Sequence, residues 1–390
     1  MEAVGIIAEY NPFHNGHLYH LKKVKEQFPD DVIILVLSGN FTQRGIPSVL
    51  NKWEKAKIAL TYGVDLIVEL PYIFATQGAD IFAEASITIL KELGATKLVF
   101  GSEENQPEKL KRLATIQLES PIYQEKVKEL LDKGENYPTA MSQALKKISG
   151  TTVTRPNDLL GLSYTKQILK QDANIETITI PRTNDYHEQE SSQSIASATS
   201  IRLALKEGKD ISHQVPKETQ KALEEQAVFI EDYFPFLRYR IMTSKDLSQY
   251  LGVDEGLEHR LQREIQTAQN YQQFVNQVKT KRYTESRIAR MLLAILCGIT
   301  KEEKKQLPTV SYLRILGFRT KGRLWLNQQK KKTTLPIYTT FNPQELGFQI
   351  ELRTTKVYSC ILPPAKMHEW IKKEYQTGPI IKKDCEERQT

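Results

Sequence analysis

The sequence predicts an α/β fold, in which a Rossmann-like, mainly parallel sheet is followed by a helix-rich, basic C-terminal region. Two observations lead to this prediction. Short apolar runs alternate with amphipathic stretches along the first third of the chain, which is the pattern of strand–helix–strand units with parallel strands. Beyond about residue 215 the periodicity becomes helical, and lysine and arginine become frequent.

The expected strands are continuous apolar runs of strand length. They cover residues 3–8, 32–37, 65–70, 97–100 and 175–180. The second run is rich in β-branched residues, which is typical of a strand that is buried on both faces. In open sheets of this kind, ligands bind beyond the carboxyl ends of the strands. The segments expected at that edge are 9–17, 38–45 and 101–104.

The expected helices show apolar residues at helical spacing. In the first part of the chain they cover 18–27, 52–62 with Asn51 as N-cap, 79–93 ended by Gly94, much of 108–145, and 199–206. In the basic region they cover 217–227, 244–251, 256–277 and 285–297. We place a catalytic domain in residues 1–210 and the basic region in residues 211–390.

Composition narrows the class of protein. The chain has 390 residues, a formal net charge of +7 and 40% hydrophobic residues, which is typical of a globular protein. No stretch approaches the roughly 20 apolar residues of a membrane span, and the N-terminus lacks the features of a signal peptide. Cys297, Cys360 and Cys385 are too few and too far apart for a disulfide framework. We therefore expect a cytoplasmic protein with no membrane association, whose basic charge indicates an anionic partner.

The pattern His14-Asn15-Gly16-His17 directly follows the first strand and opens the first helix. Gly16 allows the backbone to approach a ligand closely, and a helix N-terminus offers free N–H groups to a phosphate. Two imidazoles at this place can stabilise the charge that builds up on a phosphorus atom during transfer. The alternative is a pair of histidines that only cap or pack the helix.

The run from Glu9 to His17 resembles the HxGH signature of the nucleotidyltransferase superfamily. The resemblance implies a Rossmann-like domain that binds ATP and transfers an adenylyl group with release of pyrophosphate. A second superfamily motif, I-S-x-T-x-I-R, is similar to the segment from Ser197 to Arg202, although Ala196 separates Ile195 from Ser197. The resemblance implies that His14, His17 and Arg202 are catalytic. A serine-rich loop that caps a helix is the alternative for this segment.

A narrower resemblance covers the whole chain. The segments 4–17 and 38–45 and the run Glu69-Leu70-Pro71 are similar to the bacterial tRNA(Met) cytidine acetate ligase family. This family implies that acetate and ATP form acetyl-adenylate, and that the acetyl group then passes to N4 of the wobble cytidine of elongator tRNA(Met). Mg²⁺ is expected to accompany ATP, and no side chain is assigned as a metal ligand. The oligomeric state is left open.

The resemblance implies a set of ATP-binding residues, most of them in the first loop and helix. They are Ile7, Ala8, Glu9, Tyr10, Asn11, Pro12, Phe13, His14, Asn15, Gly16, His17, His20, Gly101, Asn157, Arg182, Ser197 and Thr199. Gly101 and Arg182 follow expected strands, where close approach of the backbone to a ligand is plausible. The alternative for Asn157 is an ordinary turn residue, and His20 is better explained as a helix-face residue than as a catalyst.

Two further groups are expected to bind substrates. Asn40, Gln43 and Arg44 follow the second strand and are suited to a carboxylate or a phosphate, the alternative being a solvated loop. The expected tRNA contacts are Lys281, Arg282, Arg287 and Arg290, with a second basic cluster at Arg319, Lys321 and Arg323 beside Trp325. Lysine and arginine neutralise phosphates, and aromatic rings stack on unpaired bases.

Two other functions are compatible with these patterns. A cofactor-type adenylyltransferase would use the same histidines on a phosphorylated small molecule, but would not need a long basic region. A non-catalytic RNA-binding protein would keep the fold as a scaffold, although the intact set of His14, Gly16 and His17 argues against it.

Overall fold

The computed structural model describes residues 1–182 and 196–383. Its centre is a sheet with the strand order β5-β4-β1-β2-β3-β6-β7, and β8 also pairs with β6. The strands are β1 (Ala3–Ala8), β2 (Val32–Ser38), β3 (Leu66–Leu70), β4 (Lys97–Ser102), β5 (Glu176–Pro181), β6 (Leu313–Arg319), β7 (Ile337–Tyr338) and β8 (Ile380–Lys382). The first five strands are parallel, so the α/β prediction is confirmed.

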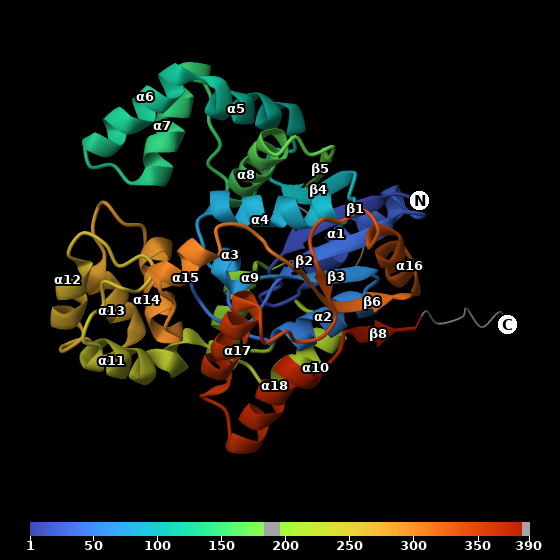
Figure 1. Ribbon diagram of the computed structural model, residues 1–390. Helices are drawn as coiled ribbons and strands as arrows, with labels where there is room; N and C mark the ends of the chain where they lie inside the picture. Colours follow the sequence, from blue (N-terminus) through green and yellow to red (C-terminus); the bar gives the residue numbers. More distant parts are fainter. Residues whose placement is uncertain (183–195, 384–390) are drawn as a thin grey trace.

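Helices cover both faces of the sheet (Figure 1). Side chains of β2 alternate between them: Ile33 and Leu35 belong to the cluster that contains α1 (Asn15–Gln27) and α2 (Lys52–Thr61). Ile34 and Val36 belong to the cluster that contains α4 (Ala79–Glu92) and α8 (Pro156–Lys170). Burial on both faces explains the continuous apolar run of this strand. Asn51 caps α2 as expected, since its side chain accepts from the N–H groups of Trp53 and Glu54.

The C-terminal region completes the same sheet. β6 runs antiparallel to β3 and covers the edge that the five parallel strands leave open. β7 and β8 then pair with β6 in parallel, at its beginning and its end respectively. The apolar run of β6 was not among the expected strands. The boundary between residues 210 and 211 stays a prediction, but the sheet contains strands from both sides of it.

Three groups of helices surround the sheet (Figure 1). The first lobe, inserted between β4 and α8, consists of α5 (Pro107–Glu119), α6 (Pro121–Asp132) and α7 (Tyr137–Ser149). The second lobe consists of α11 (Phe234–Thr243), α12 (Leu257–Glu264), α13 (Tyr271–Val278), α14 (Glu285–Cys297) and α15 (Lys301–Gln306). The third group is α17 (Leu346–Ser359) with α18 (Pro364–Gln376), which pack against each other. Within the described residues, no helix is long and apolar enough to span a membrane.

Two helix predictions in the basic region are wrong. The expected helix 256–277 is interrupted between α12 and α13, where the Asn270 side chain caps a new helix by accepting from the Gln273 N–H at 2.9 Å. The expected helix 244–251 does not form, because Asp246 accepts from the backbone N–H of Ser248 and makes a local turn. Ile195 and Cys385 lie outside the described residues.

Candidate active site

Helix α1 begins at the histidine motif. His14 is the N-cap, and its Nδ1 accepts a hydrogen bond from the backbone N–H of Gly16 at 3.0 Å. His17 Nδ1 accepts in turn from the backbone N–H of His14 at 3.2 Å. The two rings stack with their centroids 3.8 Å apart. A neutral imidazole that accepts at Nδ1 carries its proton on Nε2, so each ring keeps an Nε2–H donor for another partner.

The environment holds both rings in the neutral form. Burial, with a contribution from the charge of Arg182, lowers the pKa of His14 to about 4. Burial lowers the pKa of His17 well below its usual value, and His14 and Arg182 add to this effect. The pair therefore offers hydrogen-bond donors without positive charge at neutral pH, an arrangement that suits phosphate oxygens. The capping alternative is correct for the Nδ1 atoms and leaves the Nε2 atoms available.

Polar atoms without partners lie beside these rings. The Tyr10 ring is centred 4.8 Å from that of His17, and its hydroxyl is buried with no hydrogen-bond partner among the described residues. The Nε2 atom of His20, one turn further along α1, is also buried and has no hydrogen-bond partner among the described residues. Burial and Arg182 lower the pKa of His20 to about 4. Buried polar atoms of this kind require an explanation such as a bound ligand or ordered water.

The loop before α1 is held by the core and by contacts to distant segments. Phe13 is buried and stacks on Tyr62 at 5.4 Å between ring centroids. Asn11 Oδ1 accepts from the Val49 N–H at 2.8 Å, and the Asn11–Pro12 peptide bond is cis. Asn15 Nδ2 donates to the carbonyl of residue 213 at 2.9 Å. These contacts fix the backbone of the segment 7–17, whose contact with ATP stays a prediction.

Arg202 brings the second motif to this loop. It lies on α9 (Ala198–Lys206), and its guanidinium donates to the carbonyl of Asn11 at 2.7 Å and to Thr199 Oγ1 at 3.1 Å. Ser197 is the N-cap of α9, since its Oγ accepts from the Ser200 N–H at 3.1 Å. The two predicted motifs are therefore in direct contact, through residues 191 positions apart in the sequence. The capping alternative is correct for Ser197, and its contact with phosphate stays a prediction.

The carboxyl ends of β4 and β5 bring together the other expected ATP residues. A Cβ added at Gly101 would lie 3.1 Å from Cγ of Arg182, so the arginine side chain crosses over the glycine. The charge of Arg182 also acts on the histidines of α1, which places it on the same side of the sheet edge. Asn157, in the first turn of α8, donates to Glu103 Oε1 at 2.5 Å and so lies beside the end of β4.

The loop after β2 is held more tightly than a solvated loop. Asn40 is buried and uses both ends of its amide: Nδ2 donates to Thr355 Oγ1 at 3.0 Å, and Oδ1 accepts from the Lys52 N–H at 3.0 Å. The backbone N–H of Gln43 donates to Glu9 Oε1 at 2.6 Å. Arg44 is exposed. Binding of a carboxylate by Asn40, Gln43 and Arg44 stays a prediction, and Asn40 has a structural role in addition.

Comparison with known proteins agrees with this geometry. The model of the HIGH nucleotidyl transferase family matches residues 1–374. A tRNA(Met) cytidine acetate ligase of Geobacillus sp. (strain WCH70) is 42% identical over 400 residues, which cover 98% of this chain and 100% of the relative. The ligase of the same name from Listeria monocytogenes serovar 1/2a is 39% identical, with 98% and 100% coverage.

The chain belongs to the tRNA(Met) cytidine acetate ligase family. The crystal structure of Thermotoga maritima TmcAL bound with alpha-thio ATP is 33% identical, covers 98% of this chain and 100% of its own, and superposes with a TM-score of 0.87. The apo form of TmcAL gives a TM-score of 0.89. The predicted family and its nucleotidyltransferase fold are therefore confirmed. The alternative of a cofactor-type adenylyltransferase is not favoured.

The basic residues expected to contact tRNA fall into two groups in this ligase. Lys281 and Arg282 are exposed at the start of the turn before α14, and Arg282 pairs with Glu255 at 3.0 Å. Arg287 lies over the Tyr283 ring at 4.3 Å. Arg290 points instead to the active-site loop, where it donates to the carbonyl of Gln43 at 3.2 Å. Burial and the charge of Arg287 lower the pKa of Arg290 to about 10.

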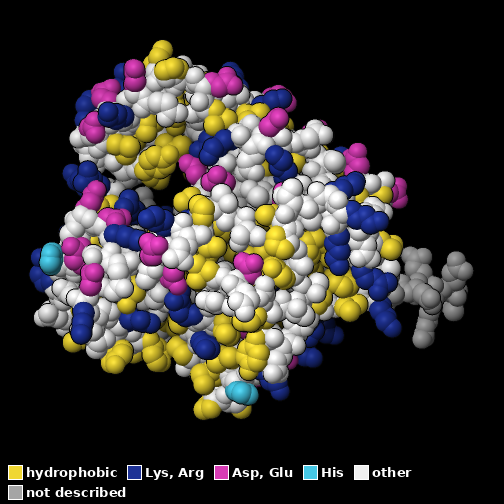
Figure 2. Space-filling view, in the orientation of Figure 1, with side chains coloured by type: hydrophobic (Ala, Val, Ile, Leu, Met, Phe, Trp, Pro, Cys, Tyr) yellow, Lys and Arg dark blue, Asp and Glu magenta, His cyan; other side chains and the backbone are white. Residues whose placement is uncertain are grey.

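Figure 2 shows a hollow between the lobe of α5–α7 and the lobe of α11–α15, with lysine and arginine side chains at its margin. The second predicted basic cluster is elsewhere. Trp325 is buried and donates from Nε1 to the carbonyl of Leu93 at 2.8 Å, and Lys321 donates to the carbonyl of Asp31 at 2.6 Å. The proposed stacking of Trp325 on a base is therefore wrong, because its ring packs against the core.

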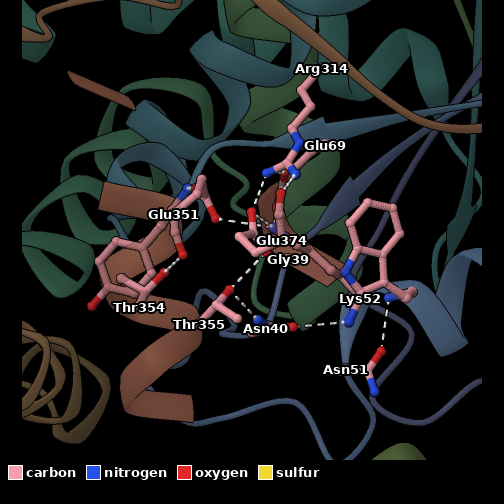
Figure 3. Close-up of polar contacts among 12 residues, drawn as sticks. Gly39, Asn40, Asn51, Lys52, Glu69, Arg314, Glu351, Thr354, Thr355 and Glu374 are labelled. Atoms are coloured by element: carbon pink, nitrogen blue, oxygen red, sulfur yellow. Dashed lines mark hydrogen bonds and ion pairs between the residues drawn. The ribbon is translucent and has the colours of Figure 1, made fainter. Parts of the chain in front are cut away.

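Sequence reasoning missed two buried lysines of α2 in this ligase. Lys52 is fully buried among carboxylates from three other elements: Nζ lies 2.6 Å from Glu69, 2.9 Å from Glu374 and 3.6 Å from Glu351 (Figure 3). Arg314 joins the cluster by pairing with Glu69 at 3.1 Å and with Glu374. Thr355 connects this ion cluster to the active-site loop, since it donates to Glu374 at 2.9 Å and accepts from Asn40.

Lys55 is the second of these lysines. Its side chain is fully buried, and Nζ donates to the carbonyls of Glu9 at 2.9 Å, Ser38 at 2.8 Å and Gly39 at 2.8 Å. No sequence pattern distinguishes Lys52 and Lys55 from exposed lysines such as Lys57 on the same helix. Within residues 1–182 and 196–383, no group of three or more His, Cys, Asp or Glu side chains is placed to hold a metal ion.

Proposed function

We propose that this protein activates acetate with ATP and transfers the acetyl group to N4 of the wobble cytidine of elongator tRNA(Met). The observation that carries the proposal is the His14–His17 pair, in which each Nδ1 accepts a backbone hydrogen bond and the ring proton is therefore carried on Nε2. The names of relatives that match the whole chain support the choice of tRNA. The bound ATP analogue of TmcAL supports the choice of nucleotide.

In the first step, an acetate oxygen attacks the α-phosphorus of ATP, the bond to the β-phosphate oxygen breaks, and pyrophosphate leaves. Negative charge rises on the oxygens around the α-phosphorus during this step. His14 and His17 donate hydrogen bonds to these oxygens without the need to lose a proton. Arg202 contributes a fixed positive charge close by, at the carbonyl of Asn11.

In the second step, the N4 amine attacks the acetyl carbon of acetyl-adenylate and AMP leaves. The amine releases a proton to water in the process, and N4-acetylcytidine is formed. We place the tRNA on the C-terminal lobe near Lys281 and Arg282, because Arg290 of the same lobe reaches the active-site loop. The compartment that contains tRNA and ATP in bacteria is the cytoplasm, where we place the reaction.

Mg²⁺ would enter with ATP, because triphosphate oxygens and water provide the ligands that this ion prefers. Among the side chains that the structure describes, none form a metal-binding group at the site. We assign the residues named above to the phosphates.

The test is reconstitution with purified protein, ATP, acetate and tRNA transcripts, followed by mass spectrometry of the nucleosides. We expect N4-acetylcytidine in elongator tRNA(Met), and none when acetate is omitted or when a transcript with a different wobble base is used. Radioactive pyrophosphate exchange into ATP should require acetate and should disappear in His17→Ala. Exchange that needs a phosphorylated small molecule instead of acetate would contradict the proposal.

A further inference from the structure

We propose that Lys55 is a positioning residue for the adenylation step, whose ammonium group fixes the ATP loop and the loop after β2 relative to one another. The inference rests on the proposed function, because it concerns the same site. Lys55 contacts only protein backbone, so it acts through other residues and does not touch the reacting atoms.

Burial lowers the pKa of Lys55 to about 7, and the nearby Glu9 carboxyl group acts in the opposite direction. The geometry around Nζ favours the charged ammonium form. Nζ of Lys55 has three carbonyl oxygens within 2.8–2.9 Å, and its side chain is completely buried. An ammonium group has three N–H donors and satisfies all three acceptors, whereas a neutral amine has two. A buried charge is costly unless it is paired or hydrogen-bonded, and here the hydrogen bonds are complete.

The three acceptors stand where two parallel strands separate. β1 and β2 pair from Ala3 with Val32 to Ala8 with Leu37. Glu9 is the first residue after β1, and Ser38 and Gly39 end β2 and begin its loop. The pairing of β1 with β2 ends at Ala8 and Leu37. Directly beyond it, Lys55 donates hydrogen bonds to the backbone of both segments. One segment continues to His14 and the other to Arg44.

A second link joins the same two loops. Glu9 Oε1 accepts from the backbone N–H of Gln43 at 2.6 Å. Burial raises the pKa of Glu9, while the hydrogen bond from Gln43 and the charges of Lys55, Arg44 and Arg202 act in the opposite direction. Residue 9 is therefore held twice, through its carbonyl by Lys55 and through its side chain by Gln43. The two links use different atoms, so each is an independent observation that the relative position of the loops is fixed.

Fixed geometry is what in-line transfer at phosphorus requires. A misplacement of about 1 Å between catalytic groups and substrate lowers the rate of a reaction about 100-fold. Removing the ammonium of Lys55 leaves three buried carbonyls without a donor and allows the loops to move apart. We therefore expect the loss to appear in kcat of adenylation, because bound ATP and acetate are no longer aligned.

The chain offers a matched control on the same helix. Lys57 lies two residues further along α2, and its side chain is 69% exposed. Lys55→Met and Lys57→Met remove the same charge and keep the same chain length. We would measure kcat and KM for acetate-dependent pyrophosphate release, together with the melting temperature. Lys55→Met is expected to lose about 100-fold in kcat with a KM for ATP within a few fold, and Lys57→Met to stay within two-fold.

Two results separate this inference from the proposed function. If the unmodified protein releases no pyrophosphate with acetate, the proposed function fails. If the unmodified protein is active and folded Lys55→Met has the same kcat, the positioning role is overturned, even when the melting temperature has fallen.

A measurement that does not depend on Lys55→Met keeps the inference testable where that variant does not fold. Lysine side chains labelled with ¹⁵N should show a protected, charged ammonium signal for Lys55, assigned by its loss in Lys55→Arg. This signal should shift when a non-hydrolysable ATP analogue binds. A neutral amine at Lys55, or a signal that ATP analogue leaves unchanged, would overturn the role.

Discussion

His17 accepts a hydrogen bond from the backbone N–H of His14, the residue whose own ring caps the same helix. In each imidazole, Nδ1 accepts a hydrogen bond that caps the start of α1, and Nε2–H can donate to a ligand. The relationship makes folding of the helix and preparation of the site one event. It also allows the two roles to be separated by substitution.

His14→Asn is expected to preserve the fold and impair the reaction. Asparagine is among the best N-cap residues, so the change in unfolding free energy should stay within about 1 kcal/mol. The Nε2–H donor is lost, and pyrophosphate release should fall about 100- to 1000-fold, the usual effect of removing one donor to a charged transition state. Urea unfolding and pyrophosphate assays on the same preparation check both halves. A normal rate would show that His14 only caps the helix.

Stability should fall on acidification through the histidine range. In the folded protein, burial and the charge of Arg182 lower the pKa values of His14 and His20 to about 4, below the ordinary histidine value of 6.5. Between these two values the unfolded chain binds more protons than the folded one, so the free energy of unfolding falls as pH decreases from 6.5 to 4. Melting curves across this range measure the effect. The slope should be smaller in His14→Asn, and an identical slope would contradict the assignment.

Arg202→Lys tests the junction of the two motifs. The guanidinium donates to Asn11 and Thr199 at the same time, which a lysine ammonium at this position cannot reproduce in the same geometry. Loss of one or two charged hydrogen bonds corresponds to about 1.5–3 kcal/mol, or a decrease of roughly 10- to 100-fold in kcat/KM for ATP. Steady-state kinetics with varied ATP measures it. A change of less than two-fold would show that Arg202 is not needed at the phosphates.

Lys52→Met is expected to destabilise the whole molecule. It leaves Glu69, Glu351 and Glu374 buried without their shared lysine, with Arg314 as the remaining positive charge. Removing one partner of a buried ion pair costs about 3–5 kcal/mol. Urea unfolding should show this loss, while Lys57→Met should change stability by less than about 0.5 kcal/mol. Equal stability of the two variants would mean that the cluster holds no charged lysine.

Lys281→Glu tests the proposed tRNA surface. Lys281 is exposed before α14, so reversal of its charge should weaken tRNA binding without a large effect on the fold. If Lys281 contacts one phosphate, the slope of log affinity against log salt should decrease by about one unit. Filter binding at several salt concentrations measures the slope. Lys57→Glu, on α2, serves as the control, and an equal effect in both variants would place the tRNA elsewhere.

The parallel sheet and the histidine motif could be predicted because both are local in the sequence. The apolar, β-branched composition of the run from Val32 to Leu37 predicts a buried strand. The motif from His14 to His17 follows a predicted strand and opens a predicted helix. Burial of Lys52 and Lys55 could not be predicted, because an amphipathic helix with lysines is typical of a solvated surface.

Two of the carboxylates that pair with the buried Lys52 lie far away in the sequence. Glu351 and Glu374 come from α17 and α18, and no periodicity connects them with α2. Asn40 is similar: its amide is occupied by Thr355 of α17, so a residue that resembles a ligand contact also holds the loop in place. The edge strand β6 was missed for the same reason, since its partner β3 lies more than 240 residues earlier.

This ion cluster has a consequence for the order in which the enzyme is made. Lys52 and Glu374 are 322 positions apart, and a ribosome that adds about 5–20 residues per second needs roughly 15–65 s to cover that distance. During this time the nascent sheet has an uncovered edge at β3, and Lys52 lacks the two carboxylates of α17 and α18. We therefore expect the catalytic loops to reach their final arrangement, and the chain to gain activity, only near the end of synthesis, when α18 arrives.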